Sequence, residues 1–209
     1  MVDLAGHPGA LQSVLHCLRI AMFFNIPNLL TWTRIVAIPL LVWVFQWPVD
    51  MPMRNLMATV MFVLFALTDW LDGLLARRLN QTSAFGAFLD PVADKFLVCA
   101  SLLVLVDLGR VPVVVALLII GREIAISSLR EWMALIGAHT RVAVHMIGKV
   151  KTSVQMVAIP FLLYDGVLFG AFSTGYWGGL LIWLAALLTV GSMFFYLQKA
   201  IPFIKEKQF

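Results

Sequence analysis

Charged side chains are scarce in this chain. Asp, Glu, Lys and Arg together account for 12% of its 209 residues, while 62% of the residues are hydrophobic. A water-soluble domain is about half apolar and carries about a quarter of its residues as charged side chains. The composition therefore excludes an ordinary soluble domain and indicates one integral membrane domain. No nucleic-acid partner is expected.

Cysteine and histidine are also few. Cys17 and Cys99 lie far apart and show no spacing typical of a metal site, so both are interpreted as apolar filler. None of the four histidines pairs with another at ligand spacing. A metal site in this chain would therefore have to use carboxylate ligands.

Long apolar stretches predict an all-α integral membrane protein with six transmembrane helices. A helix needs about 20 apolar residues to cross the hydrocarbon core. Pro39 and Pro160 fall inside expected crossings, and membrane helices tolerate this when neighbouring helices surround them. The six expected crossings cover residues 28–47, 55–78, 87–107, 111–136, 150–165 and 176–198.

The distribution of Lys and Arg predicts the orientation. Basic residues gather on one side of the membrane, at the link between crossings two and three, at the link between four and five, and in the tail. The other side carries only Arg54 and Arg110. By the positive-inside rule both termini lie in the cytoplasm. A multi-pass protein of the bacterial cytoplasmic membrane is expected.

Residues 1–24 are interpreted as an N-terminal extension of a membrane domain that covers residues 25–209. The extension lacks a basic segment followed by an apolar core, so a secretory signal is not expected. Leu11–Phe24 has the character of an amphipathic helix that lies in the membrane interface. A start of the native protein at Met22 is an equal alternative.

Four carboxylates are concentrated in one otherwise apolar stretch: Asp69, Asp72, Asp90 and Asp94. Residues three and four apart share one helix face, so each pair points one way from its helix. A polar turn at residues 80–83 would fold the two helices into a hairpin and join the pairs into one anionic cup at the cytoplasmic side. Ligand oxygens of this kind select hard cations such as Mg²⁺ or Mn²⁺.

The same stretch, D-x-x-D-G-x-x-A-R, eight residues, G-x-x-x-D-x-x-x-D, resembles the signature of the CDP-alcohol phosphotransferase family at every fixed position. The resemblance extends from about Phe24 to about Gln198 and is strongest to bacterial members that use glycerol 3-phosphate. It implies a two-metal site held by Asp69, Asp72, Asp90 and Asp94. It also implies that Asp94 is the general base and that the protein is a homodimer.

Further residues are assigned to the CDP-linked lipid. Gly73 and Ala76 lack bulk and would let a nucleotide approach the helix, although packing of small residues against another helix explains each of them in isolation. The guanidinium of Arg77 suits a phosphate. Asn28 and Thr31 share a helix face that, in the relatives, lies beside the nucleotide–lipid site.

A second polar cluster is assigned to the acceptor alcohol. The expected ligands of an acceptor phosphate are Arg122, Arg130, Lys149 and Lys151. An arginine inside a membrane helix is a functional candidate by default. Two alternatives stay open: Arg122 and Glu123 form a structural pair, or Lys149 is a plain positive-inside residue.

These expectations combine into a metal-dependent transferase. It would transfer the phosphatidyl group of CDP-diacylglycerol to glycerol 3-phosphate and release CMP, with membrane lipid as its surroundings. Charge alone also admits another phosphorylated alcohol, such as inositol phosphate. A divalent-cation transporter is the alternative from a different class, since buried carboxylates also mark ion paths.

Overall fold

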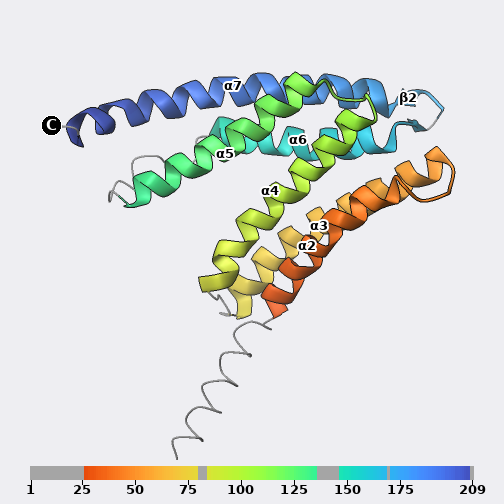
Figure 1. Ribbon diagram of the computed structural model, residues 1–209, viewed down its shortest axis with the longest axis horizontal. Coiled ribbons are helices and arrows are strands. Elements are labelled where there is room, and N and C mark those ends of the chain that lie inside the picture. The colour runs from red at the N-terminus through yellow and green to blue at the C-terminus, as the bar shows by residue number, and fades with distance from the viewer. Residues whose placement is uncertain (1–25, 80–83, 136–145, 169, 208–209) are drawn as a thin grey trace, which may run out of the picture.

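The computed structural model describes residues 26–79, 84–135, 146–168 and 170–207 of the chain. Within these ranges the fold consists of six α-helices and one pair of short antiparallel strands (Figure 1). The prediction of an all-α protein holds apart from that pair. The elements are α2 (Ile26–Val44), α3 (Met51–Leu79), α4 (Ala84–Asp107), α5 (Val113–Leu135), α6 (Met146–Tyr164), β1 (Val167–Leu168), β2 (Phe172–Ser173) and α7 (Thr174–Lys207).

Gly and Pro determine the turn between α4 and α5. Gly109 follows α4 with a φ of 69°, a left-handed conformation that glycine adopts without steric cost. The carbonyl of Pro112 then accepts the first hydrogen bonds of α5, from the backbone amides of Val115 and Ala116. As predicted, Pro39 and Pro160 lie inside α2 and α6 without ending them.

The largest difference from the expected crossings is at the end of the last helix, and α3 and α6 each begin four residues early. The last helix continues to Lys207 instead of ending near residue 198. A helix of 34 residues is roughly 51 Å long, well beyond a hydrocarbon layer about 30 Å thick. One end of α7 therefore extends past any bilayer that its apolar part crosses.

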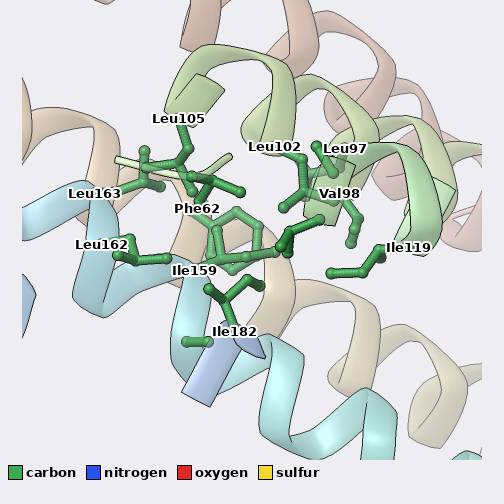
Figure 2. Close-up of a cluster of buried hydrophobic side chains, with 14 of the residues drawn as sticks. Phe62, Leu97, Val98, Leu102, Leu105, Ile119, Ile159, Leu162, Leu163 and Ile182 are labelled. Carbon is green, nitrogen blue, oxygen red and sulfur yellow. The ribbon is translucent and has the colours of Figure 1, made fainter. Parts of the chain in front are cut away.

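The core is centred where α3 to α7 converge. Phe62 of α3 belongs to one buried cluster with Leu102 of α4, Ile119 of α5, Ile159 of α6 and Ile182 of α7 (Figure 2). All five side chains are almost completely buried. Outside this centre, α6 and α7 pack along each other, and α2 packs against α3 and α4.

The outer surface is apolar, as a membrane protein requires. Leu117 of α5 and Leu187 of α7 are each 68% exposed, and many other large apolar side chains face outward. Within the described residues, two helical stretches are long and apolar enough to cross a membrane, Met51–Thr68 and Thr174–Phe195. Charged residues interrupt α4 and α5, and the apolar stretches of α2 and α6 are shorter.

The chain alternates direction, so many helix ends gather at two poles, while the ends of α5 and α7 lie apart from both (Figure 1). The first pole holds the start of α2, the end of α3 and the start of α4 (Figure 1). The opposite pole is fastened by Arg110, which follows α4. Its guanidinium donates to Asn55 Oδ1 of α3 and to the carbonyls of Leu162 and Leu163 at the end of α6, and it pairs with Asp165.

Candidate active site

The four signature aspartates lie at the first pole. Asp69 and Asp72 occupy the last three turns of α3, and Asp90 and Asp94 lie in the first three turns of α4. Leu79 and Ala84 are five residues apart, which limits the gap between the two helices to at most about 18 Å. The topology thus agrees with the predicted hairpin. The turn itself and the side chains of Asp69, Asp72 and Asp90 lie outside the described parts of the chain.

Asp94 is the signature aspartate whose side chain is described, and it lines a cavity. The cavity has a volume of about 310 Å³ and is bounded by α3 and α6 in addition to α4. Apart from Asp94 its lining is apolar, with Phe62, Ala66 and Leu67 on one side and Met156 on another. A carboxylate at an apolar cavity suits a ligand that is partly lipid and partly polar.

A buried ionic cluster joins α5, α6 and α7. The ammonium of Lys151, which has no exposed surface, donates to Glu123 Oε1. Arg122 Nη1 lies 3.5 Å from the same carboxylate oxygen, and its Nη2 donates to Ser192 Oγ at 3.0 Å. Within the described part of the chain, the cluster therefore holds two cations against one carboxylate.

A second chain of hydrogen bonds connects this cluster to α4. Lys95, the residue after Asp94, donates to Ser127 Oγ. The Ser127 hydroxyl donates in turn to the backbone carbonyl of Glu123 at 2.7 Å. The helix turn that carries the candidate base is thereby tied to the turn that carries the ionic cluster.

Sequence reasoning did not assign roles to Lys95, Ser127 and Ser192. Lys95 could have been found, because a lysine in an apolar helix is a functional candidate by default. Ser127 lies four residues after Glu123, on the same helix face. Ser192 gives no such signal, since small hydroxyl residues are frequent in membrane helices.

The predicted acceptor ligands divide into two groups. Arg122 and Lys151 are brought together by the structure, but around Glu123, which agrees with the alternative of a structural pair. Arg130 lies two turns beyond Arg122 on α5 and is exposed. Lys149 belongs to the first turn of α6, and its side chain lies outside the described part.

The predicted ligands of the CDP-linked lipid are located by their helices. Asn28 and Thr31 lie in the first two turns of α2, while Gly73, Ala76 and Arg77 lie in the last turns of α3. All five therefore belong to the pole of the aspartates. Their side chains are not among those that the structure describes, so their contacts stay predictions.

The metal site also stays a prediction. Among the side chains that the structure describes, no group of three or more His, Cys, Asp or Glu residues gathers. That set includes Asp94 but none of the other three predicted ligands. The donor chemistry fits a hard divalent cation, because the pole offers carboxylates from two adjoining helix ends.

Comparison with known proteins identifies relatives over most of the chain. The sequence profile described as CDP-alcohol phosphatidyltransferase matches residues 24–191. A protein of Escherichia coli strain K12 named CDP-diacylglycerol–glycerol-3-phosphate 3-phosphatidyltransferase is 47% identical over 181 residues, covering 86% of this chain and 96% of the relative. A protein of Salmonella choleraesuis with the same name is 46% identical over the same shares.

Proposed function

The chain belongs to the CDP-alcohol phosphatidyltransferase family, and on this premise we propose that it transfers the phosphatidyl group of CDP-diacylglycerol to sn-glycerol 3-phosphate. The acceptor hydroxyl attacks the phosphorus of the phosphatidyl group, a new P–O bond forms, and the bond to CMP breaks. The products are phosphatidylglycerophosphate and CMP. This reaction is a step in phospholipid biosynthesis.

The observation that carries the proposal is the position of Asp94 between two different environments. On one side it lines a cavity that is otherwise apolar, which suits the acyl part of a lipid substrate. On the other, its neighbour Lys95 is connected through Ser127 to the basic cluster, which suits a phosphate. A lipid-linked donor and an anionic acceptor can thus meet at one carboxylate.

The signature aspartates take the roles that the family implies. Asp69, Asp72, Asp90 and Asp94 would hold a pair of Mg²⁺ or Mn²⁺ ions. Bound metal supplies electrostatic stabilisation of the diphosphate and of the displaced oxygen. Asp94 accepts the proton of the attacking hydroxyl, as a carboxylate within hydrogen-bond reach can do.

The donor headgroup is assigned to the ends of α2 and α3. Gly73 and Ala76 leave room for the nucleotide beside α3, and Arg77 binds a phosphate of the donor. Asn28 and Thr31 contribute polar contacts from α2. The shared location of these residues at the pole of the aspartates supports the assignment.

The acceptor is assigned to the basic cluster. Arg122, Arg130, Lys149 and Lys151 provide the positive charge that a phosphate monoester needs and that serine, choline or ethanolamine does not. Inositol phosphate would satisfy the same charges. The names of the relatives favour glycerol 3-phosphate.

Cation transport is less well supported. A transporter places its ion site near the midplane of the membrane, along a polar path. Here the aspartates lie at the ends of α3 and α4, and the cavity beside Asp94 is otherwise lined by apolar side chains. These features favour chemistry on a lipid.

The membrane arrangement is part of the proposal. The six helices cross the cytoplasmic membrane of a bacterium, with both termini and the aspartate pole on the cytoplasmic side, where glycerol 3-phosphate would be available. Two copies associate as a homodimer. The exposed apolar surface and the asymmetry of Lys and Arg support this placement.

An acceptor screen tests the proposed function. Purified protein is incubated with CDP-diacylglycerol, Mg²⁺ and one acceptor at a time, and CMP release is measured. We expect turnover with glycerol 3-phosphate and little with glycerol, serine or inositol phosphate. Equal turnover with free glycerol would exclude the assignment of the acceptor, and ion flux into vesicles without CMP release would favour the transporter.

A further inference from the structure

We propose that Glu123 is a positioning residue that occupies the place of the acceptor phosphate until the acceptor binds. The proposal rests on the proposed function and adds that the Glu123 carboxylate competes with the acceptor phosphate for Lys151. In the structure Lys151 is held by the Glu123 carboxylate. When a phosphate monoester arrives, it takes over Lys151, and the carboxylate moves aside.

The charges of the cluster create the demand for an anion. Among the described residues, two cations contact the Glu123 carboxylate, Arg122 and Lys151. Buried cations require a counterion, since removing a charge from water is unfavourable unless an opposite charge compensates. A phosphate monoester carries up to about two negative charges, so it can replace the single charge of Glu123 opposite Lys151 and Arg122.

The difference in burial indicates which partner moves. The side chain of Lys151 has no exposed surface, whereas that of Glu123 is 22% exposed. The carboxylate is therefore the member of the pair that faces open space, and the ammonium is the member that is enclosed. Glu123 also has three side-chain torsions with which to leave.

The other contacts of the cluster stay in place during such an exchange. Arg122 is anchored to Ser192 Oγ independently of Glu123, and its distance of 3.5 Å from the carboxylate is long for an ion pair. Ser127 binds the backbone carbonyl of Glu123 and not its side chain. The Glu123 side chain can therefore turn away while α4, α5 and α7 remain connected.

The exchange would also select the acceptor. A neutral alcohol such as glycerol offers no charge that can replace the carboxylate on Lys151. Displacement of Glu123 by glycerol would leave a buried ammonium uncompensated, which is unfavourable. A phosphate monoester replaces the lost charge. The site then excludes unphosphorylated alcohols by a penalty, besides attracting phosphorylated ones.

Binding of inorganic phosphate to Glu123→Gln tests the proposal. Glutamine keeps an oxygen that accepts a hydrogen bond from Lys151 but removes the competing charge. We expect phosphate to bind roughly tenfold tighter than to the wild type by isothermal titration calorimetry, because no carboxylate charge competes with it for Lys151. The KM for glycerol 3-phosphate should fall, and that for CDP-diacylglycerol should stay unchanged.

Three further variants show whether the tightening depends on the charge at position 123 and on Lys151. Glu131→Gln removes a charge from an exposed position two turns further along α5, and it should leave phosphate binding near the wild-type value. In a Lys151→Met background, Glu123→Gln should no longer tighten phosphate binding, since the ammonium for which carboxylate and phosphate compete is missing. Glu123→Asp keeps the charge, but its shorter side chain holds the charge further from Lys151. Its affinity for phosphate should therefore lie between those of the wild type and Glu123→Gln.

Weaker phosphate binding in Glu123→Gln, or tightening that persists without Lys151, would overturn the proposal. Should Glu123→Gln fail to fold, Glu123→Asp decides by the same criterion. Calorimetry on inorganic phosphate needs no turnover. An inactive wild type would therefore refute the proposed function alone, and a wrong direction of the shift would refute the role of Glu123 alone.

Discussion

Replacement of Arg110 should destabilise the protein strongly without affecting its chemistry. This side chain is only 11% exposed and joins three elements at the pole away from the aspartates. Nη1 donates to the carbonyls of Leu162 and Leu163 at 3.0 and 2.9 Å, Nη2 donates to Asn55 Oδ1 at 2.9 Å, and Nε lies 3.1 Å from Asp165 Oδ2. Arg110→Met removes every one of these contacts and keeps the apolar stem.

The magnitude follows from what the arginine leaves behind. The last carbonyls of a helix have no partner within it, so Leu162 and Leu163 depend on the guanidinium. Asn55 is 6% exposed, and its Oδ1 loses the donor that Arg110 supplies. Each buried polar group left unsatisfied costs about 1–3 kcal/mol. Asp165 is 44% exposed and adds less than about 1 kcal/mol. Because one guanidinium serves all of these groups, their costs overlap, and we expect a total loss of about 3–5 kcal/mol.

Thermal unfolding in detergent measures this loss. For a chain of this size about 1 kcal/mol corresponds to roughly 2–4 °C, so Arg110→Met should lower the Tm by roughly 10 °C. The Tm of Arg110→Lys should lie between those of the wild type and Arg110→Met, since one ammonium cannot replace the planar guanidinium. Asp165→Asn is the matched control and should change little.

Two further readouts make this prediction specific. Burial lowers the pKa of Arg110 and Asp165 opposes that shift, yet the guanidinium stays protonated, so the loss should not vary between about pH 6 and 9. Asp94 lies about 20 Å away along α4, so CMP release per folded molecule should be unchanged. A Tm within about 3 °C of the wild type, or a loss of turnover in folded protein, would contradict the role of Arg110 as a purely structural clamp.

The remaining predictions concern the site and the core. Removal of divalent metal by EDTA should abolish CMP release, and Mg²⁺ or Mn²⁺ should restore it, whereas full activity in metal-free buffer would exclude the carboxylate metal site. Asp94→Asn should lower kcat by about 10²–10⁴-fold if Asp94 is the base. Donor binding should survive better in Asp94→Asn than in Asp69→Asn, and a near-normal rate would contradict the assignment. Gln155 is 4% exposed, and its Oε1 has no hydrogen-bond partner among the described residues. Gln155→Met should therefore raise stability by about 1 kcal/mol, and a lower Tm would indicate a partner for that oxygen.

Much of the fold could be predicted from apolar runs and their interruptions. The expected positions of the helices agree with α2 to α5 to within about four residues, because Gly109 and Pro112 mark a turn that only a few conformations satisfy. The expected crossing ends with the apolar run near residue 198, whereas α7 itself continues through Lys199 and Pro202 to Lys207. The β1–β2 pair lies in the link between the fifth and sixth expected crossings, where no strand was predicted. Two residues per strand give no alternating pattern that a sequence could display.

Some features of the candidate site depend on neighbours in the sequence, and others depend on contacts between distant residues. Spacing of three and four residues assigns Asp69 and Asp72 to one helix face without any structure. The contact between Glu123 and Lys151 joins positions 28 residues apart, and that between Arg122 and Ser192 joins positions 70 apart. Such pairs depend on how α5, α6 and α7 cross, which no periodicity along the chain specifies.

The two arginines of α5 and its preceding turn illustrate how the same side chain serves different purposes. Arg110 is saturated, since its contacts are helix-end carbonyls, an amide and one partly exposed carboxylate, and no ligand is needed to complete them. Arg122 belongs to a cluster in which cations outnumber the single described carboxylate. The first arrangement gains only rigidity, so its loss should appear in the Tm. In the second, an incoming anion can take the place of the carboxylate, so its variants should appear first in the binding of phosphate.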